Sequence, residues 1–519
     1  MFDSILVANR GEIALRIMRT AQAMGIQTIA IYVDADKDAP HVRFADKAVL
    51  LPDGGYLDID AVLDAAQKSN AGAIHPGYGF LSENSEFATR VIKEKIFWVG
   101  PSPKVISVMG DKLKAKELAI KASVPTLPMT SNEKEVKKIG YPLLIKAAAG
   151  GGGKGMRVVT DKKDLQESLE GAKREALSGF GDERVFIERY VEKSRHIEIQ
   201  ILGDSHGNVI HLGERECSIQ RRHQKIIEES PSPRITEEIR FAMGNAAVDL
   251  AKKIKYESAG TVEFLFDDKS GEFWFLEVNT RLQVEHPVTE EVTGIDLVAE
   301  QIKIARGEEL QYSQEDIEWT GSSIEARLYA ENPNNDFLPE TGKMFAYEQA
   351  ENDFMTRWDS GVHKDSVIGT NFDPMLAKVI SYGETREDAA RVLAKSLEDS
   401  HIGGVITNKD FLIATLRSDE FLKGNTTTDF IERVKPPRVK NLTNDELNFA
   451  LTAAAMWKQM RNRISSDIAP YIPSGWTNGR LPNPNITFLL DGEEIFVEYK
   501  LINKNKFLVF NSEVEVVNI

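Results

Sequence analysis

The sequence of 519 residues contains a single cysteine, Cys217, and no run of about 18 apolar residues. One cysteine excludes an internal disulfide and is typical of a reducing compartment, so a cytoplasmic location is expected. The missing apolar run excludes a membrane-spanning helix. We interpret Cys217 as a buried thiol without a chemical role, in preference to a catalytic one.

An excess of basic residues is also missing, because 64 lysines and arginines face 80 aspartates and glutamates, which gives a net charge of −16. A protein that binds nucleic acid through its phosphates needs a positive field, so nucleic acid is not an expected partner. Small anionic ligands stay compatible with local arginines and backbone amides. Asp3 and Glu12 interrupt the apolar character of the first twenty residues, so no signal peptide is expected there.

The residues that are present, 42% hydrophobic and 28% charged, have the proportions of a globular protein, and the length predicts about two to four domains. An apolar strand at 4–9, a helix at 12–24 that Gly25 ends, and a second strand in QTIAIYV open the chain. This alternation predicts a βαβ start with a parallel sheet. The dinucleotide fingerprint GxGxxG is absent, because NRGEI carries one glycine.

A second unit is expected from residue 141, where the strand YPLLIKAA, the loop AGGGGKGM and the strand RVV precede a helix and another strand. Two antiparallel strands joined by the turn DSHGN and a hairpin, TVEFLFDDKSGEFWFLEV, follow. Mixed α/β segments continue to about residue 440. The remaining tail is predicted to hold one helix and several strands, as a small separate appendage.

The hairpin places two acids opposite each other. If its turn centres on Ser270, then Glu263 faces Glu277, and opposed residues on antiparallel strands have β-carbons about 5 Å apart. Two carboxylates among apolar neighbours repel unless a cation lies between them. Asn279 adds a neutral oxygen on the same face, and oxygen ligands favour Mg²⁺ or Mn²⁺. The alternative is that one carboxylate points to solvent.

Polar residues continue on alternate positions beyond Asn279. The planar guanidinium of Arg281 can bind an oxyanion, and Glu285 is a carboxylate able to take a proton. A metal with few protein ligands usually shares its coordination shell with substrate phosphates. The row is therefore predicted to be one strand that forms the floor of a site for a metal, an anion and a base.

Four consecutive glycines at 150–153 let the backbone approach a phosphate, and Lys146 on the preceding strand can reach the α- or β-phosphate. This is not a P-loop, because Gly155 rather than Ser or Thr follows Lys154. A nucleotide lid is preferred over a flexible tip. The loop HPGYGFLSEN (75–84) is either a turn or a ligand loop at the carboxyl end of the sheet.

Two further segments have plain alternatives. The stretch RECSIQRRHQKIIEE gathers Arg222, His223 and Lys225 beside acids, which indicates either an anion site or a solvated charged face. Arg327 in SSIEARLYAENP is a lone arginine on a strand, and such residues are usually structural.

Six stretches in order, ANRGEIALRI, IHPGYGFLSEN, MGDK, GGGGKGMRVV, RRHQK and EVNTRLQVEHPVTE, resemble the biotin carboxylase component of biotin-dependent carboxylases, an ATP-grasp enzyme. The similarity runs from residue 1 to about 440. It implies an α/β and α+β fold: a Rossmann-like parallel-sheet domain at 1–112, an ATP-grasp domain at 113–330 with its lid at about 127–191, a mixed C-terminal domain at 331–440 and a partly β appendage at 441–519.

The resemblance implies a complete set of binding residues. The contacts implied for ATP are Lys112, Lys146, Gly151, Gly152, Gly153, Met156, Glu188, Arg189, Tyr190, Val191, His196, Gln220 and His223. Those implied for Mg²⁺ or Mn²⁺ are Glu263, Glu277 and Asn279, and those implied for bicarbonate are Lys225, Arg281, Gln283 and the backbone of Val284. Glu285 is implied to deprotonate bicarbonate for attack on the γ-phosphate, which gives carboxyphosphate, and Arg327 to stabilise the biotin enolate.

The biotin acceptor motif Ala-Met-Lys-Met is missing, because none of the 12 methionines is followed by lysine. Biotin is therefore expected on a separate biotin carboxyl carrier protein, unless the chain is a fragment. The tail after 440 resembles the segment that contacts the carboxyltransferase in acyl-CoA carboxylases. The chain is therefore expected to serve an acetyl- or propionyl-CoA carboxylase and to form a homodimer.

Three alternatives remain for the function. The same protein can serve a pyruvate carboxylase, or the chain is another ATP-grasp ligase, such as half of a carbamoyl-phosphate synthetase. A non-catalytic assembly module is the third, and the presence of Lys225, Arg281, Glu285 and both metal carboxylates argues against it.

Overall fold

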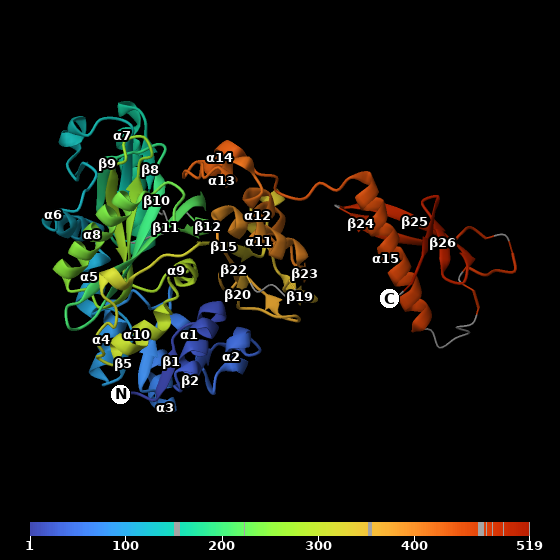
Figure 1. Cartoon of the computed structure of the whole chain (residues 1–519), viewed down its shortest axis with the longest axis horizontal. Helices are drawn as coiled ribbons and strands as arrows, with labels where there is room; N and C mark the ends of the chain where they lie inside the picture. The colour runs from blue at the N-terminus through green and yellow to red at the C-terminus, as the bar shows by residue number, and fades with distance from the viewer. Residues whose placement is uncertain are drawn as a thin grey trace. The chain divides into compact units, whose positions relative to one another are not determined.

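The computed structural model describes residues 1–149, 156–222, 224–350, 355–465, 472–473, 475–479, 481–490 and 492–517. The chain forms two compact units, Met1–Val439 (unit 1) and Lys440–Ile519 (unit 2), drawn in Figure 1. Four residues implied to contact the nucleotide, Gly151, Gly152, Gly153 and His223, lie outside the described residues.

Unit 1 begins with the predicted parallel sheet, which has five strands in the order β3-β2-β1-β4-β5. Apolar residues of α1 at helical spacing, among them Ile13 and Ile17, pack in one core with Ile5 and Val7 of β1. The strands are β1 (Ser4–Val7), β2 (Gln27–Tyr32), β3 (Lys47–Leu50), β4 (Ala73–His75) and β5 (Phe97–Trp98). The helices of this stretch are α1 (Gly11–Ala23), α2 (Pro40–Phe44), α3 (Ile59–Ser69), α4 (Ser85–Lys93), α5 (Pro103–Met109) and α6 (Lys112–Lys121).

The predicted lid is a four-stranded antiparallel sheet in the order β6-β9-β7-β8. Its elements are β6 (Met129–Thr130), β7 (Leu143–Ala147), β8 (Arg157–Val159), α7 (Leu165–Phe180) and β9 (Val185–Arg189). Leu169 and Ala172 of α7 share a small core with Leu143, Ile145 and Ile187, so the helix covers one face of this sheet (Figure 1).

The centre of unit 1 is an eight-stranded antiparallel sheet in the order β14-β13-β10-β11-β12-β15-β22-β20. The sheet continues past residue 330, where a domain boundary was expected, because β22 and β20 add to the edge formed by β15. The strands are β10 (Arg195–Gly203), β11 (Val209–Arg221), β12 (Gln224–Ser230), β13 (Ser258–Phe266), β14 (Phe273–Asn279), β15 (Ser322–Tyr329), β20 (Thr356–Ser360) and β22 (Met375–Gly383).

Helices and short strands complete unit 1. The helices are α8 (Glu237–Ile254), α9 (His286–Thr293), α10 (Leu297–Ala305), α11 (Arg386–Asp399), α12 (Lys409–Leu416), α13 (Asp419–Leu422) and α14 (Phe430–Val434). The short strands are β16 (Glu331–Asn332), β17 (Leu338–Pro339), β18 (Gly342–Lys343), β19 (Ala346–Glu348), β21 (Val367–Ile368) and β23 (His401–Gly403). None of the helices in the described part of the chain combines the length and apolar character needed to cross a bilayer.

The pairing predicted for the hairpin is confirmed, since Glu263 of β13 is the direct partner of Glu277 of β14. The prediction of one polar strand through Glu285 is wrong. Strand β14 ends at Asn279, the chain turns, and α9 begins at His286. Pro287 explains the change, because proline lacks the N–H of a strand ladder but fits the first turn of a helix.

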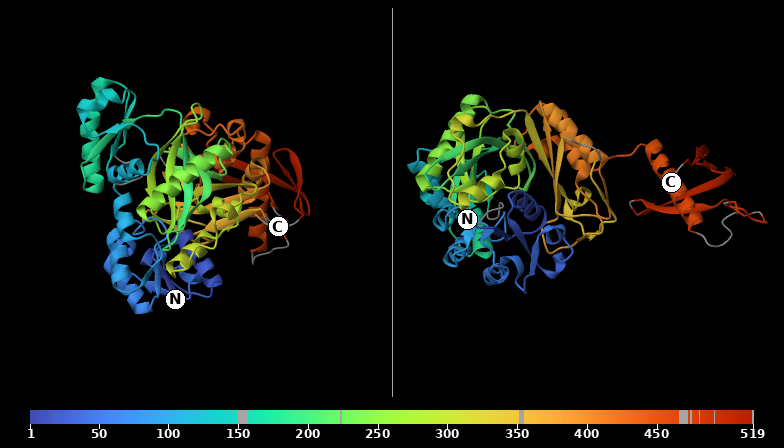
Figure 2. Two further views of the ribbon diagram at one scale, coloured as in Figure 1. Left: turned by 60° about the vertical axis from the view of Figure 1, so that its left-hand side comes forward. Right: turned by 60° about the horizontal axis from the view of Figure 1, so that its bottom comes forward.

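Unit 2 has the predicted helix and strands. Its elements are α15 (Asn444–Ile464), β24 (Asn485–Leu490), β25 (Glu493–Asn503), β26 (Lys506–Val509) and β27 (Ser512–Glu515). Thr443 and Glu446 form a capping box at the start of the helix. Leu451 and Ala455 of α15 pack against Val497 and Phe507 of the antiparallel sheet, so the helix lies against one sheet face (Figure 2).

Candidate active site

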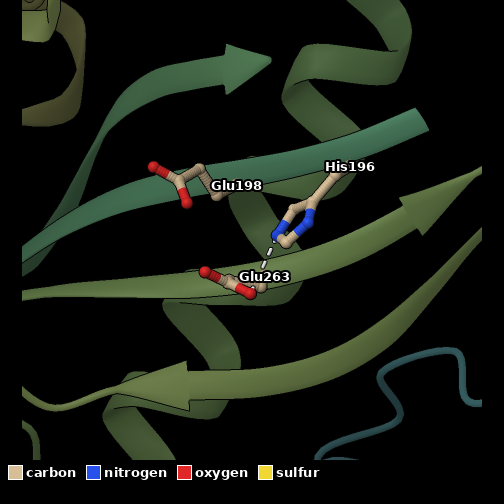
Figure 3. Close-up of side chains that lie close together, drawn as sticks. All are labelled: His196, Glu198 and Glu263. Atoms are coloured by element: carbon tan, nitrogen blue, oxygen red, sulfur yellow. Dashed lines mark hydrogen bonds and ion pairs between the residues drawn. The ribbon is translucent and has the colours of Figure 1, made fainter. Parts of the chain in front are cut away.

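Three neighbouring strands place three carboxylates in one row. Glu198 of β10 is the register partner of Glu263, which in turn faces Glu277. The ligand atoms of His196, Glu198 and Glu263 lie within 4.8 Å of one another, and Figure 3 shows these side chains gathered between β10 and β13. Sequence reasoning missed Glu198. Its signal was the alternation of His196, Glu198 and Gln200 with Ile197, Ile199 and Ile201.

The histidine in this row has a defined tautomer. Its Nδ1 lies 2.8 Å from the amide Nε2 of Gln220, and its Nε2 lies 2.8 Å from Glu263 Oε2. Because the amide nitrogen donates, Nδ1 of His196 accepts, and the Nε2 hydrogen is donated to Glu263. Two residues implied to approach the nucleotide thus fix one oxygen of the Glu263 carboxylate.

The donor set fits a hard divalent cation. Glu263, Glu277 and Asn279 come from two paired strands and offer carboxylate and amide oxygens, which Mg²⁺ and Mn²⁺ prefer. In the structure, Asn279 Nδ2 donates to Glu263 Oε1 over 2.9 Å, and Lys112 Nζ lies 3.6 Å from Glu277 Oε2. Lys112 therefore offsets part of the negative charge of this row.

Lys225 is the central cation of the site. Its Nζ lies 2.6 Å from Glu198, 2.9 Å from Glu263 and 2.6 Å from Glu285. The carboxylate row and the turn after β14 therefore meet at one ammonium group. The interpretation of this segment as a solvated charged face does not hold for Lys225, whose side chain is only 13% exposed.

Glu285 is fully buried at the N-cap of α9. Besides Lys225, it binds Nη2 of Arg327 over 3.0 Å, and Sγ of Cys217 lies 3.9 Å away. Burial alone would raise the pKa of this carboxyl, but Lys225, Arg327 and Arg215 hold it below its usual value. Glu285 is therefore ionised at neutral pH.

Arg327 is more than a lone structural arginine. Its side chain is buried, and its Nε donates to Glu228 Oε1 over 2.6 Å while Nη2 binds Glu285. Burial raises the pKa of Glu228 to about 7, although Arg327 opposes the shift.

Cys217 is buried, as predicted.

Arg281 lies two residues after the end of β14 and contacts Glu83 of the loop 75–84. Its Nε donates to Glu83 Oε2 over 2.9 Å, Nη1 lies 3.1 Å from Gln283 Oε1 and Nη2 lies 3.3 Å from Asn279 Oδ1. Glu83 also accepts from the backbone N–H of Thr280 over 3.1 Å. The loop 75–84 therefore supplies the group that orients Arg281, and sequence reasoning missed Glu83.

Among the residues predicted to contact the nucleotide on the lid side, Glu188 has two lysines beside it. This carboxylate is buried on β9 between Lys146, whose Nζ is 2.8 Å away, and Lys116 of α6. Arg189, Tyr190 and Val191 follow it and are partly or fully exposed, as is Met156 on the other side of the glycine loop. Lys116 was not predicted, because its helix gave no ligand pattern.

Three family models match the chain. They are the biotin carboxylase N-terminal domain over residues 1–106, the ATP-binding domain of the carbamoyl-phosphate synthase L chain over 111–313 and the biotin carboxylase C-terminal domain over 325–433.

Curated relatives carry several names. Biotin carboxylase 2 of Bacillus subtilis is 46% identical over 445 residues, which cover 83% of this chain and all of that protein. The human propionyl-CoA carboxylase alpha chain is 47% identical over 469 residues, 88% of this chain, and this chain spans 64% of its length. A pyruvate carboxylase subunit of Methanothermobacter thermautotrophicus is 48% identical over 447 residues, 84% of this chain and 90% of that one.

Solved structures agree in fold. The biotin carboxylase domain dimer of the Hydrogenobacter thermophilus 2-oxoglutarate carboxylase, in complex with MgADP, ADP and bicarbonate, has a TM-score of 0.81 and 44% identity, with 84% and 98% of the two chains covered. A biotin carboxylase complex from Campylobacter jejuni has a TM-score of 0.81 and 43% identity, with 83% and 99% covered.

Proposed function

Because the chain belongs to the biotin carboxylase family of ATP-dependent ligases, we propose that it carboxylates biotin with ATP and bicarbonate. The observation that carries the proposal is the position of Glu285. This ionised carboxylate lies between Lys225 and Arg327, and Lys225 also contacts Glu263, the register partner of Glu277. We therefore propose that a base, anion-binding cations and an oxygen donor set for Mg²⁺ or Mn²⁺ form one site.

The nucleotide would bind against the lid. Lys112 and Lys146 would hold its phosphates, and Glu188, Arg189, Tyr190 and Val191 would line the adenine pocket. His196, Gln220 and His223 would approach the nucleotide, and Gly151, Gly152, Gly153 and Met156 would cover it. Mg²⁺ or Mn²⁺ held by Glu263, Glu277 and Asn279 would supply charge neutralisation at the phosphates.

Bicarbonate would bind against Arg281, Gln283, Lys225 and the backbone N–H of Val284, with Glu285 as the base. A carboxylate with a lowered pKa is a weak base, so we propose that the proton leaves as the new O–P bond forms. The bicarbonate oxygen attacks the γ-phosphorus, the bond to the β-phosphate oxygen breaks, and ADP and carboxyphosphate result.

The second half of the proposed reaction transfers the carboxyl group. Carboxyphosphate breaks into CO₂ and phosphate, and the phosphate takes the proton of the biotin ureido nitrogen. The nitrogen then attacks CO₂. Arg327 would stabilise the negative charge of the biotin enolate, because a buried guanidinium stabilises such charge more than water does.

We assign the chain to the acyl-CoA carboxylases, with an acetyl- or propionyl-CoA carboxylase as the first choice. The alignment with the human propionyl-CoA carboxylase alpha chain covers 88% of the 519 residues, more than the 439 residues of unit 1, and so reaches into unit 2. Unit 2 exposes Phe449, Trp457, Leu489 and Phe496, which suits a contact with a carboxyltransferase. A role in a pyruvate carboxylase is the second candidate, supported by the 48% identity of the Methanothermobacter protein.

The proposed partners are a biotin carboxyl carrier protein, a carboxyltransferase and a second copy of this chain. A dimer is supported by the solved Hydrogenobacter domain, and a reducing cytoplasmic location by the single cysteine. Affinity capture of the native complex, followed by assays with acetyl-CoA, propionyl-CoA and pyruvate, would identify the acceptor.

ATP hydrolysis with bicarbonate and free biotin tests the activity. We expect phosphate release to require bicarbonate and to rise when biotin is added, and Glu285→Gln to abolish this rise. Stimulation by ammonia instead of biotin would assign the chain to the carbamoyl-phosphate synthetase type and would contradict the proposal.

A further inference from the structure

The turn that contains Val284 and Glu285 is bound by a buried lysine that has no part in the proposed reaction. Lys378 on β22 is 0% exposed, and its Nζ donates to the backbone oxygen of Val284 over 2.9 Å. Its register partner on the neighbouring strand β15 is Arg327, which binds the side chain of Glu285. Two adjacent cations of the sheet thus hold two consecutive residues of the turn.

Two acids balance the charge of Lys378. Its Nζ lies 3.6 Å from Glu12 Oε2 on α1 and 3.7 Å from Asp359 Oδ2 on β20, the strand on the other side of β22. Arg357 also binds Asp359, over 2.8 Å. Glu12 belongs to the NRGEI segment, which contributes none of the residues proposed for ATP, metal or bicarbonate.

The backbone beside Glu12 is closely packed. A Cβ added at Gly361 would lie 2.9 Å from the backbone nitrogen of Glu12, so the start of α1 touches the segment that follows β20. This close approach packs the backbone of Glu12 against the segment that follows β20, the strand whose Asp359 also faces Lys378.

Both peptide planes of the turn are held. The backbone oxygen of Gln283 receives the backbone N–H of His286 over 3.3 Å and Nδ1 of the same residue over 2.8 Å. The N–H and C=O of one planar trans peptide point in opposite directions. Holding the oxygen of Gln283 therefore directs the N–H of Val284, and holding the oxygen of Val284 directs the N–H of Glu285.

We infer that Lys378, which faces Glu12 and Asp359, is a positioning residue for the bicarbonate step. It holds the peptide between Val284 and Glu285, which directly follows the peptide that carries the Val284 N–H, so that the backbone donor and the base keep one geometry. This inference rests on the proposed function. The contact of Lys378 with the turn is its hydrogen bond to the backbone oxygen of Val284. Misplacing reacting groups by about 1 Å can cost on the order of 100-fold in rate.

The test compares K378M, E12Q, the double variant K378M/E12Q and the matched control K395M. Lys395 is an exposed lysine of α11 that pairs with Asp399. K378M removes the ammonium that faces the buried Glu12, so thermal stability should fall, and neutralising Glu12 in the double variant should restore it. Biotin-dependent ATP hydrolysis is then titrated separately with bicarbonate and with ATP.

We expect both variants that lack Lys378 to lose about 10- to 100-fold in kcat/KM for bicarbonate, while KM for ATP changes less than about 3-fold. K395M should behave like the wild type. A merely structural lysine would lower the amount of folded enzyme, which changes the apparent kcat but not KM, and the double variant would recover it.

Two results would overturn the role of Lys378 without affecting the proposed function. One is recovery of kcat/KM for bicarbonate in K378M/E12Q, and the other is an equal loss of kcat/KM for ATP and for bicarbonate. A wild-type chain without bicarbonate- and biotin-dependent turnover would overturn the proposed function and this inference together.

Discussion

Arg281→Ala is the sharpest test of the proposed bicarbonate site. Arg281 contacts Glu83, Gln283 and Asn279, and none of these contacts belongs to the lid side of the site. The substitution should therefore remove a bicarbonate ligand and leave the lysines proposed for the ATP phosphates in place.

The magnitude follows from the contacts that are lost. A hydrogen bond between a guanidinium and a carboxylate-type oxyanion contributes about 1.5–3 kcal/mol, which corresponds to roughly 10- to 150-fold in kcat/KM for bicarbonate. Stability should change little, because the Glu83 side chain is 42% exposed and water can replace its partner. We expect a loss of about 1 kcal/mol or less.

The assay combines two measurements on the same preparation. Steady-state phosphate release with free biotin gives kcat/KM for bicarbonate, and titration calorimetry gives the affinity for MgADP. Arg90→Ala is the matched control, since Arg90 is an arginine of α4 that pairs with Asp60 on the surface. It should leave both quantities unchanged.

One combination of results would refute the reasoning. If Arg281→Ala weakened MgADP binding by 10-fold or more and left KM for bicarbonate unchanged, Arg281 would be a nucleotide ligand. The bicarbonate site would then have to be placed elsewhere among the charged residues around Lys225 and Glu285.

Four further predictions use other parts of the chain. Glu277→Gln should raise the Mg²⁺ concentration for half-maximal activity, whereas the exposed Glu272→Gln should not, and equal titrations would count against the metal assignment. Burial raises the pKa of Glu12 to about 7 in the folded protein. Ionised Glu12 therefore costs about 3 kcal/mol of stability above pH 7, and this cost disappears below the pKa that Glu12 has in the unfolded chain. Glu12→Gln should raise thermal stability at pH 8 but not at pH 4. Cys217 should react with a thiol reagent only after denaturation, because it is buried and its pKa is raised. A 1–439 fragment should retain biotin-dependent ATP hydrolysis but not co-purify with a carboxyltransferase.

The facing acids of the hairpin could be predicted because their pairing is local. Glu263 and Glu277 belong to one hairpin, so the alternation of side chains and the position of the turn determine their register. The structure also has a register shift that the sequence did not show. Phe264 pairs with Phe275 rather than with Leu276, and an irregularity between Glu263 and Phe264 brings Glu263 back opposite Glu277. The prediction was right at the acids although the residues nearer the turn are offset by one.

The remaining site residues are brought together by long-range contacts. Lys378 is 94 residues from Val284, and Glu83 is 198 residues from Arg281. Periodicity within one segment cannot show which strand becomes the neighbour of another. Buried charge on an apolar strand was the available signal, as in Glu198 and Lys378, but it indicates only that a partner exists and not which one.

The charges of the site constrain how it can bind substrate. Lys225 is shared by three carboxylates, and Arg327 by two, so each cation already has a partner within the protein. Binding of a bicarbonate or a phosphate must therefore exchange protein partners for ligand partners rather than add new charges to bare groups. Such an exchange involves little desolvation of the cations, because they are already removed from water. It also requires that the backbone around Glu285 does not move while its partners change, which is the condition that the contact between Lys378 and Val284 provides.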